Sequence, residues 1–166
     1  ITISREYGCP AKLISSRLAE ELTKKLFVKG KDIKWKYVTK EIMAESARAL
    51  EVDPDKIKFV FDYVQKGMID GIISAQLNKY YKSERKIRNT VARVIRNMAY
   101  EGNVIIIGRG GVAIAHDIPR SLHIMLDAPL EWRTLRVAEN YHISQAEARR
   151  TSIEVDKKRK EFRDYF

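Results

Sequence analysis

The sequence contains a single cysteine, Cys9, among its 166 residues. One thiol cannot form an internal disulfide, and free thiols are typical of a reducing cytoplasm, which is therefore the expected location. Long hydrophobic runs are also missing. The strongest run, from Val104 to Ile107, has the length of a strand and falls far below the roughly 18 residues of a membrane span. No charged and then apolar leader is present, so we expect neither secretion nor a membrane partner.

Acidic residues are too few to balance the basic ones. The chain has 32 lysines and arginines against 22 aspartates and glutamates, a net charge of +10. This excess predicts an anionic partner, whether a nucleotide, a nucleic acid or an acidic surface. The length suits one domain, residues 1–166, with a sizeable core. No internal repeat or low-complexity linker divides it.

The N-terminal stretch has the pattern of a strand, a tight loop and a helix. Residues 1–4 alternate apolar and small polar side chains, residues 8–10 (Gly-Cys-Pro) break regular structure, and apolar residues then recur at helical spacing from Lys12 onward. In α/β proteins this order directs free backbone N–H groups and a helix dipole at one point, which favours a bound phosphate. A lysine at the helix entry adds a point charge for the β- and γ-phosphates.

The loop departs from the usual phosphate-binding sequence G-x-x-x-x-G-K-[ST]. If Lys12 is the motif's lysine, Ala11 replaces its second glycine, Leu13 replaces the hydroxyl that holds magnesium, and Glu6 replaces the leading glycine. Ser15 is a candidate substitute for the missing magnesium ligand, which is otherwise unknown. The alternative is a plain β-loop-α unit in which Lys12 is a solvated residue of the first helical turn.

Apolar spacing and turn residues locate the remaining elements. Short strands are expected at 104–107 and 122–126, parallel to the N-terminal strand, because each apolar run is followed by a loop and a helix. A strand or loop is expected at 35–38. The expected helices cover residues 40–50, a segment that begins at Asp53-Pro54, and residues 84–100, 130–140 and 144–166. Ser144 with Glu147 forms a capping box, which predicts the start of the last helix. The basic side chains of the 84–100 helix are most simply a solvated face; alternatively, some reach a phosphate.

Arg109 stands between glycines directly after the buried strand at 104–107. Ligands of open α/β sheets gather at the carboxyl ends of the strands. Glycines let the backbone pass close to a ligand there, and a guanidinium can grip a phosphate with two parallel hydrogen bonds. Arg109 is therefore a candidate phosphate ligand; the alternative is a strand-end turn with a surface arginine.

Four segments together resemble the cytidylate kinase-like family, which belongs to the phosphate-loop nucleoside monophosphate kinases. They read ITISREYG, VIIIGRGG, LHIMLDAPLEWRTLRV and IEVDKKRKEFRDYF. The resemblance implies an α/β P-loop NTPase fold, a parallel sheet flanked by helices, with a helical monophosphate-binding insertion at about residues 36–85 and a lid at about 133–155. Relatives close with a further strand and helix that this sequence lacks, so we expect the natural chain to continue beyond Phe166.

The implied reaction is transfer of the γ-phosphoryl group of ATP, with Mg²⁺, to CMP, dCMP or a related monophosphate. The loop would hold the ATP phosphates through Gly8, Cys9, Ala11, Lys12 and Leu13. The monophosphate would be bound by Arg109 with Gly108, Gly110 and Asp156, the aspartate facing the sugar. The implied catalytic residues are Lys12, Arg133, Arg136 and Arg159, the arginines surrounding the transferring group when the lid closes.

Two departures from the family pattern keep other functions open. Relatives read G-S-G-G-R where this chain has residues 8–12, and they place a Tyr-Asp pair where this chain has Val38-Thr39. The alternative function is therefore a non-catalytic nucleotide-binding protein with a degenerate phosphate loop. A basic nucleic-acid-binding protein ranks third, because no aromatic-basic stacking motif accompanies the basic helix near residues 84–96.

Overall fold

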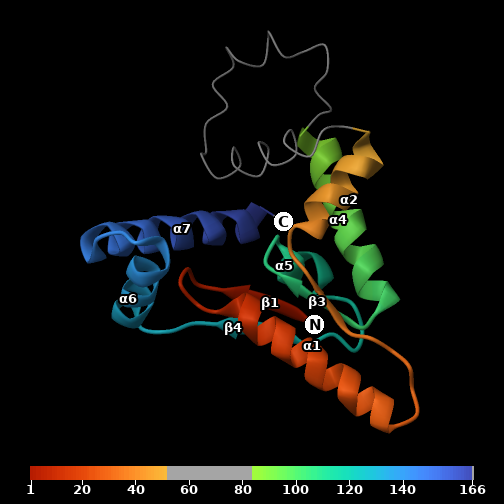
Figure 1. Ribbon diagram of the computed structural model, residues 1–166. Coiled ribbons are helices and arrows are strands. Elements are labelled where there is room, and N and C mark those ends of the chain that lie inside the picture. Colours follow the sequence, from red (N-terminus) through yellow and green to blue (C-terminus); the bar gives the residue numbers. More distant parts are fainter. Residues whose placement is uncertain (52–83, 166) are drawn as a thin grey trace.

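The computed structural model describes residues 1–51 and 84–165 (Figure 1). Within these residues a parallel four-stranded sheet forms in the order β2-β3-β1-β4. Strand β1 pairs in parallel with β3 and β4, and β2 pairs in parallel with β3. The strands are β1 (Thr2–Arg5), β2 (Lys36–Val38), β3 (Val104–Ile107) and β4 (His123–Leu126). The predicted parallel arrangement of the three strongest apolar runs is therefore confirmed.

Strand β3 lies inside the sheet, between β2 and β1, and its residues are apolar on both faces. Val104 and Ile106 belong to a core cluster with residues of α2 (Glu41–Leu50) and α4 (Glu84–Glu101). Ile105 and Ile107 belong to a second cluster with residues of α1 (Ala11–Val28). Successive side chains of a strand point to opposite faces, so an uninterrupted β-branched run is what a strand covered on both sides requires.

Helices α1, α2, α4, α6 (Leu130–Tyr141) and α7 (Gln145–Tyr165) lie within a few residues of the predicted ones. The short helix α5 (Gly111–Ala115) follows β3, where a helix was expected without stated bounds. The helix predicted to begin at Asp53-Pro54, and most of the predicted monophosphate-binding insertion, lie outside the described residues. Arg85, Lys86 and Arg93 of α4 are exposed, as expected of a solvated face. None of the helices within the described ranges is long and apolar enough to cross a membrane.

Helices α6 and α7 pack against each other at one end of the sheet (Figure 1). His142 closes α6 in the left-handed conformation, with φ of 55°. The hydroxyl of Ser144 then accepts a hydrogen bond from the N–H of Glu147 at 3.2 Å, which confirms the predicted cap at the start of α7. From there α7 runs back toward α5, so its C-terminal half reaches the ends of β1 and β3.

Candidate functional site

A cavity of about 280 Å³ lies where the carboxyl ends of β1 and β3 meet the C-terminal half of α7. Of the described residues that line it, none is acidic. Its basic residues are Arg5, Arg109, Lys158, Arg159 and Arg163. A hollow with basic walls at this edge of a parallel sheet is suited to an anionic ligand.

The turn after β3 brings two of these arginines together. Gly108, Arg109 and Gly110 have successive φ angles of 67°, 57° and 70°, and the N–H of Gly111 closes the turn on the carbonyl of Gly108 at 2.9 Å. A Cβ atom on Gly108 would lie 1.8 Å from Nη1 of Arg5. The absence of a side chain at Gly108 leaves room for the Arg5 guanidinium, which lies directly against the backbone that precedes Arg109.

Positive charge is crowded at this end of the sheet. Burial, and then the like charges of Arg159 and Arg109, lower the pKa of Arg5 to about 10. Burial also lowers the pKa of Arg159, against the opposing effect of Asp156. The Arg159 guanidinium donates to the carbonyl of Arg5 at 3.1 Å and lies 5.3 Å from the ring centroid of Tyr7. These cations repel one another, and a bound anion would offset that repulsion.

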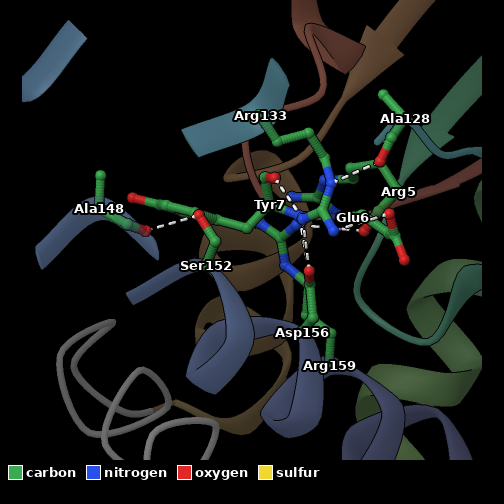
Figure 2. A network of polar contacts seen from close by, with 9 residues as sticks. All are labelled: Arg5, Glu6, Tyr7, Ala128, Arg133, Ala148, Ser152, Asp156 and Arg159. Atoms are coloured by element: carbon green, nitrogen blue, oxygen red, sulfur yellow. Dashed lines mark hydrogen bonds and ion pairs between the residues drawn. The ribbon is translucent and has the colours of Figure 1, made fainter. Parts of the chain in front are cut away.

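Beside the cavity, Arg133 joins α6 to the loop after β1 (Figure 2). Its Nη1 atom donates to Asp156 Oδ2 at 2.6 Å and to the carbonyl of Tyr7 at 3.0 Å. Its Nη2 atom lies 3.1 Å from Glu6 Oε2, and its Nε atom donates to the carbonyl of Ala128 at 2.9 Å. Only 7% of the side chain is exposed. Arg133 is thus a buried arginine whose hydrogen-bonding groups are engaged by the protein itself.

Three N–H groups of the loop after β1 also donate within the protein. The N–H of Tyr7 donates to Asp156 Oδ1 at 2.6 Å, that of Cys9 to the carbonyl of Glu6 at 3.3 Å, and that of Ala11 to the carbonyl of Cys9 at 2.9 Å. Pro10 has no N–H to offer. In this arrangement these three N–H groups are not available to a phosphate.

Comparison with known proteins places this arrangement in a family. The model of the Cytidylate kinase-like family matches residues 1–166, the whole chain. The chain belongs to the cytidylate kinase-like family. A search of curated proteins found no match.

One solved structure resembles this cytidylate kinase-like chain throughout. It is the crystal structure of an uncharacterized protein from Eubacterium ventriosum, with 19% sequence identity and a TM-score of 0.64. The match covers 99% of this chain and 75% of that one. At this identity the likeness supports the mixed α/β fold, a parallel sheet flanked by helices, and nothing about substrate.

The cavity brings together only some of the residues predicted for this family member's site. Gly108, Arg109, Gly110 and Arg159 line it, whereas Lys12, Arg133, Arg136 and Asp156 are not among its lining residues. Arg136 is partly exposed on α6, with its guanidinium 5.9 Å from the ring centroid of Trp132. The catalytic and sugar-binding roles of these residues remain predictions.

Lys12 is exposed in the first turn of α1. Its charge acts on Glu41: the backbone N–H of Thr39, chiefly, and Lys12, most weakly, lower the pKa of that carboxyl group. Leu13 is also exposed, whereas Ser15 is fully buried and its hydroxyl has no hydrogen-bond partner among the described residues. The predicted contacts of the loop with ATP remain predictions.

The described residues present no ready-made set of side-chain ligands for a magnesium ion, which in nucleotide complexes is held largely by phosphate oxygens and water. Hard cations need oxygen ligands, and no group of three or more His, Cys, Asp or Glu side chains within the described ranges is arranged to hold a metal ion. Leu13 offers no oxygen, and the oxygen of Ser15 lies in the core.

Sequence reasoning assigned no role to Arg5, Lys158 or Arg163, which also line the cavity. Arg5 is the last residue of β1, so the rule that located Arg109 at a strand's carboxyl end would have found it too. Arg159 and Arg163 are four residues apart and therefore share one face of α7. Lys158 pairs with Glu154 at 2.7 Å.

Proposed function

We propose that this chain is a phosphotransferase that moves the γ-phosphoryl group of ATP to a nucleoside monophosphate, with CMP or dCMP the acceptor that the family resemblance favours. The observation that carries the proposal is the basic cavity at the carboxyl ends of β1 and β3, in a member of the cytidylate kinase-like family. Phosphoryl transfer needs little covalent help from a protein, because positioning and charge neutralisation supply most of the rate enhancement.

In this proposal Arg109 binds the phosphate of the acceptor. Its place in a glycine-flanked turn supports the role, because the turn holds Arg109 at the cavity wall. The turn does so in a left-handed backbone conformation that costs an L-residue roughly 1–2 kcal/mol. Arg159 reaches the same cavity from α7 and would neutralise the transferring group. Arg133 would act indirectly, by keeping the lid helix α6 against the loop, and Arg136 would be the lid arginine that reaches substrate.

The proposal is tested by incubating the protein with ATP, magnesium salt and each nucleoside monophosphate, and by measuring ADP and nucleoside diphosphate. We expect Arg109→Met to raise the KM for the monophosphate about 10- to 100-fold, since a hydrogen bond to a charged group contributes roughly 1.5–3 kcal/mol. The KM for ATP should change much less.

Arg120→Met is the matched control. Arg120 also has a positive φ, 60°, but is exposed in the loop before β4 and does not line the cavity. The control removes the same charge under the same backbone constraint, so its KM values should equal those of the parent. An equal rise of both KM values in Arg109→Met would contradict its assignment to the acceptor site.

A second function is favoured by the state of the loop. The N–H groups of Tyr7, Cys9 and Ala11 donate within the protein and are therefore not offered to the phosphates of ATP. Fewer donors to position the γ-phosphate for transfer favour a protein that binds a nucleotide without catalysis. Calorimetric titration with ATP separates the two functions: binding without product for any monophosphate favours the second. If Lys12 contacts the donor phosphates, Lys12→Ala should abolish turnover in a protein that stays folded; parent kinetics in that variant would remove Lys12 from the donor site.

A further inference from the structure

We propose that Arg5 is a phosphate-binding residue, and that Arg5, Arg109 and Arg159 together hold a single phosphomonoester group carrying two negative charges. The inference rests on the proposed function for the identity of the ligand as a nucleotide's terminal phosphate. It goes beyond that function because neither the phosphate-loop motif nor the family resemblance gives Arg5 a role.

The contacts of Arg5 direct its charge into the cavity. Its guanidinium lies against the backbone of Gly108, where even a Cβ atom would collide with Nη1. Its carbonyl accepts the hydrogen bond from Arg159, which holds that second arginine beside it at 3.1 Å. Both side chains line the same cavity as Arg109. Three arginines from β1, the β3 turn and α7 therefore meet at one place.

Arg5 lacks the compensation that buried arginines normally have. Arg133, close by, is surrounded by two carboxylates and two backbone carbonyls. Among the ion pairs that the described residues form, none includes Arg5 or Arg159. A cation withdrawn from water without an ion-pair partner is costly, and for Arg5 we assign that partner to an anion from solution.

The combined positive charge of the three arginines determines which anion fits the cavity. Burial and the neighbouring arginines lower the pKa of Arg5, which means that the folded protein disfavours its charged form. A dianion placed among three cations reverses this effect more fully than a monoanion. The site should therefore prefer a phosphomonoester to a phosphodiester, and binding should weaken as pH falls through about 6, where the phosphate takes up its second proton.

The test compares Arg5→Met with the parent protein by calorimetric titration with CMP, and with inorganic phosphate as the minimal probe. We expect both ligands to bind Arg5→Met about 10- to 100-fold more weakly. Arg17→Met is the matched control, because Arg17 is an exposed arginine on α1 outside the cavity, and its affinities should equal those of the parent. Without ligand, the Tm of Arg5→Met should equal or exceed that of the parent, since the substitution removes a repelled charge.

Equal affinity of Arg5→Met and the parent for both ligands would overturn the inference. Should Arg5→Met fold poorly, Arg5→Lys provides the same test: it keeps the charge but loses the guanidinium fork, so we expect weaker binding, and parent affinity would again overturn the inference. If Arg5→Met loses phosphate binding and the parent turns over no monophosphate, the inference is supported and the kinase function fails. If the parent turns over a monophosphate and Arg5→Met binds phosphate as tightly as the parent does, the kinase function is supported and the inference fails.

Discussion

Replacing Arg133 by methionine should destabilise the protein far more than any other single loss of charge on α6. Methionine has a comparable length and keeps much of the packing of the arginine stem, so the substitution removes mainly the guanidinium. What is lost is one group that contacts the loop after β1, the segment before α6, and α7 simultaneously. The carboxylates of Asp156 and Glu6 would be left beside each other without their cation.

The structure sets the size of the effect. Removing one partner of a buried ion pair costs roughly 3–5 kcal/mol. Asp156 and Glu6 keep 21% and 32% of their side chains exposed, so water compensates part of the loss. We therefore expect the lower end, about 3 kcal/mol of unfolding free energy. For a domain of this size that corresponds to a fall in Tm of about 6–12 °C.

Urea denaturation followed by circular dichroism measures the change in unfolding free energy, and thermal denaturation measures the change in Tm. Arg136→Met is the matched control, because it removes an arginine from the same helix whose only contact described here is with an aromatic ring. We expect it to cost less than about 1 kcal/mol. Combining Arg133→Met with Asp156→Asn should show a coupling energy of about 1–3 kcal/mol.

A loss below about 1 kcal/mol in Arg133→Met would refute the reasoning, because it would mean that the ion pairs are no better than their hydrated components. Additive effects in the double variant would also contradict a shared network. Activity is a separate readout: Arg136→Met should lower turnover if Arg136 is the lid arginine, while leaving stability nearly unchanged.

Two further predictions concern the loop after β1. Gly8 has a φ of 91°, and its Cβ would lie 2.9 Å from Cβ of Arg133, so Gly8→Ala should cost about 2–4 kcal/mol by urea denaturation; Gly30→Ala, at a φ of 72° with open space around it, should cost only about 1 kcal/mol, and equal costs would rule out the packing argument. Burial raises the pKa of the Cys9 thiol while Arg133 lowers it, so Arg133→Met should move the midpoint of the alkylation rate by iodoacetamide to higher pH, and a midpoint that is unchanged or lower would contradict the contact.

Local patterns in the sequence determined where most elements lie. The apolar residues from Val104 to Ile107 identified a strand buried on both faces, because no other short element keeps four consecutive β-branched side chains from water. The cap at Ser144 identified the start of α7 from four residues. Arg109 was found in the same way, since its position after a strand and between glycines is a local feature. Each of these signals is carried by residues adjacent in the chain.

The tertiary structure decided which charges meet, because that depends on residues far apart in the sequence. Arg133 and Arg136 are both arginines of one helix, and the sequence offered the same lid role for each. Arg133 is buried only because a loop 126 residues earlier and a carboxylate 23 residues later close around it. Arg5 shows the converse: its neighbours in sequence mark the end of a strand, while Gly108 and Arg159 bring its charge to the cavity. Periodicity reports which face of an element is apolar; the partner of a buried charge is fixed only when the elements pack.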